Sequence, residues 1–86
     1  MDAFQEEYER HCRESPDIAE HLPRLNQLAR ECQHVTEFGV RWGSSTSAFL
    51  NSDAALRSYD IVEDPKVAKL FELAQEAGKD VRYIIG

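Results

Sequence analysis

The stretch of sequence that decides the fold is HVTEFGVRWGSST, residues 34–46. Val35, Thr36 and Phe38 are β-branched or aromatic, and such residues favour an extended strand. Gly39 follows and permits a sharp turn or the close approach of a ligand, because it has no Cβ. The hydroxyl residues 44–46 predict a helix start, since their oxygens can cap the helix that continues through residues 48–50. The stretch therefore predicts a strand, a glycine turn and a helix N-terminus.

This arrangement predicts a binding site for a ligand with a polar or charged end. The first turn of a helix has free backbone N–H groups that point outward and attract negative charge. Glu37, at the carboxyl end of the strand, is expected to place a carboxylate on the same rim. Free amides beside a carboxylate suit a zwitterion better than a bare phosphate.

Downstream of this stretch the pattern alternates between strand and helix. Residues 56–62 read as a second strand and residues 81–85 as a third. Between them Asp64 and Pro65 predict a helix start, apolar residues recur at helical spacing, and Gly78 predicts its end. Right-handed crossovers make such strands parallel and place both connecting helices on one face. The expected fold is α/β, a three-stranded parallel half-Rossmann sheet of order 3-2-1.

Upstream of it we expect two or three helices. Residues 3–14 have helical propensity with a narrow apolar stripe, and Ser15-Pro16-Asp17 ends this helix and starts another. Pro23 either kinks the second helix or starts a third. The expected organisation is N-terminal helices over residues 1–33 and a βαβαβ cofactor-binding half-domain over residues 34–86.

Composition limits the classes of function. The chain has 86 residues, a net charge of -6 and 30% charged residues, which disfavours non-specific binding to nucleic acid or an anionic membrane. No apolar run is long enough for a membrane span and no signal peptide is visible. Cys12 and Cys32 lack companions, so free thiols in a cytoplasmic protein are expected, with no metal site.

Asp60 is the second candidate binding residue. It lies 21 residues after Gly39, at the expected end of the second strand. In nucleotide-binding βαβ units an acidic residue at about this distance accepts hydrogen bonds from the ribose hydroxyls. A lone aspartate is usually a surface residue, but the glycine turn upstream favours the binding role. Gly39 and Gly43 form only the short pattern G-x-x-x-G. Trp42, between them, either shields a bound cofactor or packs in the core.

The run from Val35 to Thr46 resembles the first motif of class I S-adenosylmethionine-dependent methyltransferases, in the form found in their O-methyltransferase branch. Residues 58–61 resemble the second motif, and residues 83–86 resemble the end of the third strand. The resemblance covers residues 17–86 and implies S-adenosylmethionine as cofactor. It implies that Glu37, Gly39 and Gly43 surround the methionine part, with Ser45 or Thr46 near its carboxylate. It also implies that Asp60 binds the ribose and Ile61 lies against the adenine.

The sequence departs from this family in length, because such enzymes have a seven-stranded sheet. We therefore expect the cofactor-binding portion of a methyltransferase, not catalytically complete alone, with either a homo-oligomer or a missing C-terminal half as partner. No residue is a credible general base, since His34 begins a strand at the end opposite the site. Two alternatives are a non-catalytic binding or assembly module and a nicotinamide-dinucleotide-binding fragment. Glu37 and the missing third glycine disfavour the latter. The methyl acceptor is not readable from the sequence.

Overall fold

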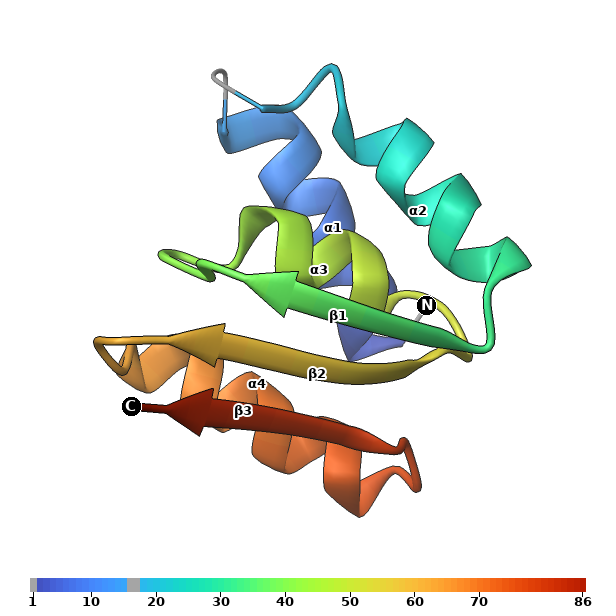
Figure 1. Cartoon of the computed structure of the whole chain (residues 1–86). Helices are drawn as coiled ribbons and strands as arrows, with labels where there is room; N and C mark the ends of the chain where they lie inside the picture. Colours follow the sequence, from blue (N-terminus) through green and yellow to red (C-terminus); the bar gives the residue numbers. More distant parts are fainter. Residues whose placement is uncertain (1, 16–17) are drawn as a thin grey trace.

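The computed structural model describes residues 2–15 and 18–86 and shows an α/β fold. In the described part of the chain two helices precede the first strand, and strands and helices then alternate (Figure 1). The elements within the described residues are α1 (Ala3–Glu14), α2 (Leu22–Glu31), β1 (His34–Phe38), α3 (Ser44–Leu50), β2 (Ala55–Asp60), α4 (Pro65–Glu76) and β3 (Val81–Ile85).

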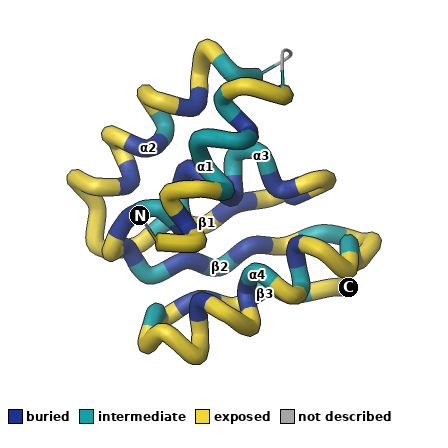
Figure 2. Tube along the Cα trace, turned by 180° about the vertical axis from the view of Figure 1, so that it is seen from behind, coloured by how far each residue is buried: buried dark blue, intermediate teal, exposed yellow. Residues whose placement is uncertain are grey.

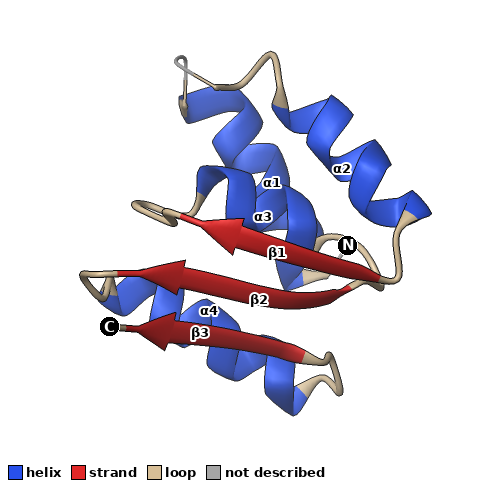
Figure 3. Ribbon diagram, viewed as in Figure 1, coloured by secondary structure: helices blue, strands red, loops and turns tan. Residues whose placement is uncertain are grey.

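The three strands form one parallel sheet with β2 in the centre. The order is β1-β2-β3, counted from the β1 edge; the order 3-2-1 expected from the sequence counts the same neighbours from the β3 edge. Phe38 is paired with Tyr59 and Tyr59 with Ile84, so these residues form one row across the strands. Figure 3 shows all three arrowheads at the same edge, where the loops after β1 and β2 also lie.

The helices leave one face of the sheet uncovered. In Figure 1 the strands lie in front, α3 and α4 lie behind them, and no described helix crosses in front of the sheet. Figure 2, seen from behind, shows buried residues both on the helices and along β2. The buried cluster joins α1, α3 and α4 to the sheet and consists of Phe4, Val40, Leu50, Leu56, Val67, Phe71, Ala74 and Val81.

Local sequence signals explain most helix boundaries. The Asp64 carboxylate accepts hydrogen bonds from the backbone N–H groups of Lys66 and Val67, at 2.8 and 3.2 Å, so the predicted cap of α4 is confirmed. Pro23 lies in the first turn of α2, which settles its role as the start of a separate helix. The predicted helix start at Pro16 lies outside the described residues.

Two predicted boundaries are wrong. The second strand ends at Asp60, two residues earlier than expected, because residues 61–64 turn away to start α4. The N-cap of α3 is Gly43 in a left-handed conformation, and no side chain caps this helix. The hydroxyl residues that were expected to cap it lie inside the helix and bind other partners. Among the described residues, no helix has the length and apolar character that a membrane crossing requires.

Candidate functional site

The glycine turn joins the end of β1 to α3 through three residues with positive φ. Gly39 and Gly43 each have φ of 86°, and Arg41 has φ of 53°. A Cβ at Gly43 would lie 3.0 Å from Val67 Cγ2, whereas a Cβ at Gly39 would meet nothing within 4 Å. Gly43 is therefore required by both conformation and packing, and Gly39 by its conformation alone.

The Asp60 carboxylate holds this turn. Its Oδ2 accepts hydrogen bonds from the backbone N–H groups of Val40 and Arg41, at 2.8 and 2.9 Å. Its Oδ1 accepts one from the backbone N–H of Ile61, at 2.7 Å. The N–H groups of Arg41, Ile61 and Val40 hold the pKa of this carboxyl below its ordinary value of 3.8. Asp60 therefore lies beside the glycine turn, as its distance from Gly39 in the sequence suggested, and there it holds the backbone of the turn.

Glu37 is buried and does not lie on the exposed rim as the sequence suggested. Only 6% of its surface is exposed, and it faces α3. Its carboxyl group accepts hydrogen bonds from three hydroxyls: Ser45 at 2.5 Å, Thr46 at 2.7 Å and Ser58 at 2.8 Å. Three residues expected around the methionine part are therefore brought together, but as an internal polar network that joins β1 to α3. Thr46 is completely buried, so a ligand reaches the hydroxyl of Ser45 more easily.

Ile61, which follows β2, and Trp42, which lies within the turn, extend into solvent. They are 81% and 72% exposed, and the Arg41 guanidinium lies 5.8 Å from the centroid of the Trp42 ring. Tyr83 holds the loop that carries Ile61. Its hydroxyl accepts a hydrogen bond from the backbone N–H of Asp64 and donates one to the carbonyl of Val62. Exposed apolar side chains on a fixed rim can cover a bound ligand.

Two pockets flank Gly39 and share it as a common wall. The first, of about 400 Å³, lies between the turn and the end of α1 and is lined by Glu14, Ser15, Ile18, Gly39, Val40, Arg41, Trp42, Ser44 and Ser45. The second, of about 540 Å³, lies at the ends of the strands and is lined by Phe38, Gly39, Tyr59, Asp60, Ile61, Ile84 and Gly86. Each volume falls within the ordinary range for small-molecule sites.

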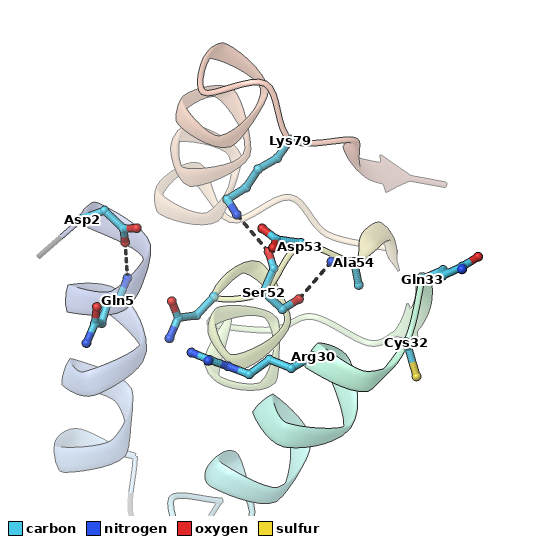
Figure 4. A pocket seen from close by; sticks show the side chains of 10 residues that line it. Asp2, Gln5, Arg30, Cys32, Gln33, Ser52, Asp53, Ala54 and Lys79 are labelled. Atoms are coloured by element: carbon cyan, nitrogen blue, oxygen red, sulfur yellow. Dashed lines mark hydrogen bonds between the residues drawn. The ribbon is translucent and has the colours of Figure 1, made fainter.

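A larger pocket of about 700 Å³ lies at the opposite end of the sheet. Figure 4 shows it: Lys79 reaches from beyond α4 toward Ser52, and Arg30 approaches from α2. The Lys79 ammonium donates to the carbonyl of Ser52 at 2.9 Å. Ligands of open parallel sheets bind outside the carboxyl ends of the strands, so the two pockets beside Gly39 are the better candidates.

Sequence reasoning missed a polar cluster between α1 and α3. His11, 5% exposed, has Nε2 at 2.9 Å from Glu7 Oε1 and Nδ1 at 3.0 Å from Ser44 Oγ. Ser15 Oγ lies 3.0 Å from Ser44 Oγ and 3.2 Å from His11 Nδ1. The cluster fastens α1 to the helix that follows the glycine turn. Glu7, His11 and Ser15 follow one another at intervals of four residues, but Ser44 lies 29 residues from Ser15 and 33 from His11, so no local pattern could reveal the contact with α3.

The titration of this cluster follows from its surroundings. Burial lowers the pKa of His11 below its ordinary value of 6.5, and the nearby Arg10 guanidinium adds to this effect. Burial raises the pKa of Glu7, but its hydrogen bond and ion pair with Arg10 outweigh this, so the pKa falls below 4.5. His11 is therefore neutral and Glu7 ionised near neutral pH.

Within residues 2–15 and 18–86, no group of three or more histidine, cysteine or acidic side chains is placed to hold a metal ion. Comparisons with protein-family models, curated proteins and solved structures gave no match. The geometry of the chain itself therefore carries the functional argument.

Proposed function

We propose that this chain is the S-adenosylmethionine-binding portion of a class I methyltransferase. The observation that carries the proposal is the position of Asp60. Its carboxylate joins the glycine turn to the end of the neighbouring strand and lines one of the two pockets that share Gly39. An elongated ligand with a nucleoside at one end and an amino acid at the other fits two such pockets joined at a glycine.

The pocket that Asp60 lines suits the adenosine part. A carboxylate has about four lone-pair positions, and three backbone N–H groups use three of them. The Val62 N–H also acts on this carboxylate, so a ribose hydroxyl would take the remaining position in place of that N–H, without loss of the turn. Ile61, Ile84 and Tyr59 supply apolar or aromatic surface to the same pocket, and such surface suits an adenine ring.

The pocket at the end of α1 suits the amino-acid part. Glu14 and Arg41 both line it, together with the hydroxyl residues Ser15, Ser44 and Ser45. A side chain of each charge complements the ammonium and the carboxylate of a zwitterion. In this proposal Glu14 and Arg41 take the place beside the amino-acid part that the sequence suggested for Glu37. The carboxyl group of Glu37 is already bound by three hydroxyls.

The proposal is tested by calorimetric titration of the chain with S-adenosylhomocysteine and, separately, with NAD. We expect S-adenosylhomocysteine to bind and NAD not to bind, because the turn lacks the third glycine of the dinucleotide motif. Asp60→Asn should weaken binding, while Asp53→Asn, a change at the opposite end of the sheet, should leave it unchanged. Equal affinity of the two variants would remove Asp60 from the site, and preferential binding of NAD would favour an oxidoreductase fragment.

A further inference from the structure

A carboxylate, an imidazole and a hydroxyl form a chain of contacts between α1 and α3. Glu7 Oε1 lies 2.9 Å from His11 Nε2, and Ser44 Oγ lies 3.0 Å from His11 Nδ1. The proposed function uses only Ser44, as part of a pocket wall. A base within hydrogen-bond reach of a hydroxyl, and itself oriented by a third group, is the arrangement that activates a nucleophile.

The neighbours of His11 decide which of its two nitrogens is the base. The ionised Glu7 carboxylate only accepts hydrogen bonds, so Nε2 carries the proton and donates to Glu7. The Arg10 guanidinium lies 3.2 Å from Nε2 and donates to Glu7 as well. Nδ1 therefore keeps its lone pair, which faces Ser44 Oγ at 3.0 Å and Ser15 Oγ at 3.2 Å.

Ser44 carries the hydroxyl that connects this base to a pocket. It is half-buried at the start of α3 and lines the pocket of about 400 Å³ between the glycine turn and the end of α1. His11 is only 5% exposed, so it meets this pocket through the serine. The Ser15 hydroxyl lies 3.0 Å from Ser44 Oγ and can donate to that oxygen, which leaves Nδ1 to Ser44. Ser45 lines the same pocket, but its hydroxyl donates to Glu37 at 2.5 Å.

We propose that Ser44 is a nucleophile that attacks small carboxylic esters bound in this pocket, with His11 as general base and Glu7 as the residue that positions the imidazole. Ser44 Oγ forms a bond to the carbonyl carbon while its proton passes to His11 Nδ1. The bond to the alkoxide then breaks, and the alkoxide takes the proton from Nδ1, so an alcohol leaves and the acyl group stays on Ser44. Water repeats both steps, which releases the carboxylic acid and restores the serine.

The other walls of the pocket suit an ester. Ile18 and Trp42 supply apolar surface for the acyl or the alcohol part. Arg41 lines the same pocket, and its guanidinium can stabilise the carbonyl oxygen as that oxygen becomes negative. The pocket therefore contains apolar surface, a positive charge and a hydroxyl that faces a base.

Charged side chains on α1 and α4 surround His11. They are Glu7, Arg10, Glu14, Asp64 and Lys66. Burial, followed by the effect of Arg10, lowers the pKa of His11 below 6.5, so the imidazole is neutral and can accept a proton at neutral pH. The Glu7 carboxylate opposes this lowering and stabilises the imidazolium that forms in each step.

A fluorophosphonate, which forms a stable ester with an activated serine, tests the nucleophile on the complete chain. We expect it to label Ser44, as located by mass spectrometry of the peptides, and to block the release of para-nitrophenolate from para-nitrophenyl acetate. Ser44→Ala should lose both reactions. Neither reaction needs S-adenosylmethionine, so the result is independent of the proposed function. A folded natural chain that is not labelled, or is labelled at Ser15 instead, would overturn the proposal.

Replacement of the histidine tests the base. His11→Gln should lower the rate of labelling about 100-fold or more, while His21→Gln, a change at an exposed histidine, should keep the natural rate. Circular dichroism of each variant checks that it is folded. Equal rates in the two folded variants would show that the serine reacts without His11, against the proposal.

The pH profile of labelling tests the role of Glu7. In the natural chain the rate should rise with pH and level off above 6.5, the ordinary pKa of His11. Glu7→Gln removes the charge that raises the imidazole pKa, so its profile should have a lower plateau and a midpoint at lower pH. Glu6→Gln, an exposed change on the same helix, should keep the natural profile. A lower rate in Glu7→Gln with an unchanged midpoint would indicate a merely structural effect and would contradict the positioning role.

Discussion

Asp60 Oδ2 lies 2.8 Å from the backbone nitrogen of Val40, a residue 20 positions earlier in the chain. This contact joins the end of the central strand to the turn after the edge strand. It also lies where Arg41 adopts a left-handed conformation with φ of 53°, which costs about 1–2 kcal/mol for a residue with a side chain. The hydrogen bond from the Arg41 N–H to the same oxygen, at 2.9 Å, offsets this strain.

The first prediction concerns acid stability. Backbone N–H groups of four residues, Arg41, Ile61, Val40 and Val62, depress the pKa of Asp60 in the folded chain, so its ionised form stabilises the fold. This stabilisation is present above the ordinary pKa of 3.8 and is lost as the pH falls through the lower value of the folded state. Circular dichroism gives the thermal midpoint at each pH from about 5 to about 2.5. As the pH falls, we expect the midpoint of Asp60→Asn to decrease less steeply than that of the natural chain. Asp53→Asn is the control and should keep the steep dependence.

The second prediction concerns the buried network around Glu37. Glu37→Ala leaves the hydroxyls of Ser45, Thr46 and Ser58 without their common acceptor, so we expect a loss of about 3 kcal/mol in the free energy of unfolding. Ser58→Ala removes one donor and should cost about 1 kcal/mol. Urea denaturation measures both losses. Similar values for the two variants would mean that Glu37 does not hold the network together.

The third prediction separates the two glycines of the turn. Gly39→Ala adds only the strain of a left-handed residue, about 1–2 kcal/mol, because its Cβ meets nothing within 4 Å. Gly43→Ala adds the same strain and a contact at 3.0 Å with Val67 Cγ2, so it should be the more destabilising. Urea denaturation should show this order, and Val67→Ala should reduce the difference between the two glycine variants. Binding of S-adenosylhomocysteine should respond in the opposite order, since Gly39 is a wall of both pockets.

The fourth prediction concerns the histidine between α1 and α3. Burial, aided by Arg10, lowers the pKa of His11, so the folded chain favours neutral imidazole. The stabilisation that neutral His11 contributes is therefore fully present above its ordinary pKa of 6.5. It is lost as the pH falls through the lower pKa of the folded state. We expect the loss of stability between pH about 7 and about 5.5 to be smaller in His11→Gln. An exposed histidine provides the control: His21→Gln should behave as the natural chain does.

The local signals in the sequence determined the order and type of the elements. The β-branched and aromatic run before Gly39 gave β1, the Asp64–Pro65 pair gave the start of α4, and the alternation of strand and helix gave a parallel sheet. These features depend on neighbours within a few residues, so the sequence contains them directly. The distance of Asp60 from Gly39 was also readable, because parallel strands end at one edge.

Only the tertiary structure decided what the side chains do at that edge. Glu37 and Ser58 meet because β1 and β2 are in register, which places a carboxyl group under α3 and away from the rim. His11 meets Ser44 because α1 packs on α3, across 33 residues of sequence. Such contacts depend on packing between elements, and periodicity along the chain does not encode it. For the same reason Phe38, Tyr59 and Ile84 lie side by side only once the register aligns three strands in one sheet.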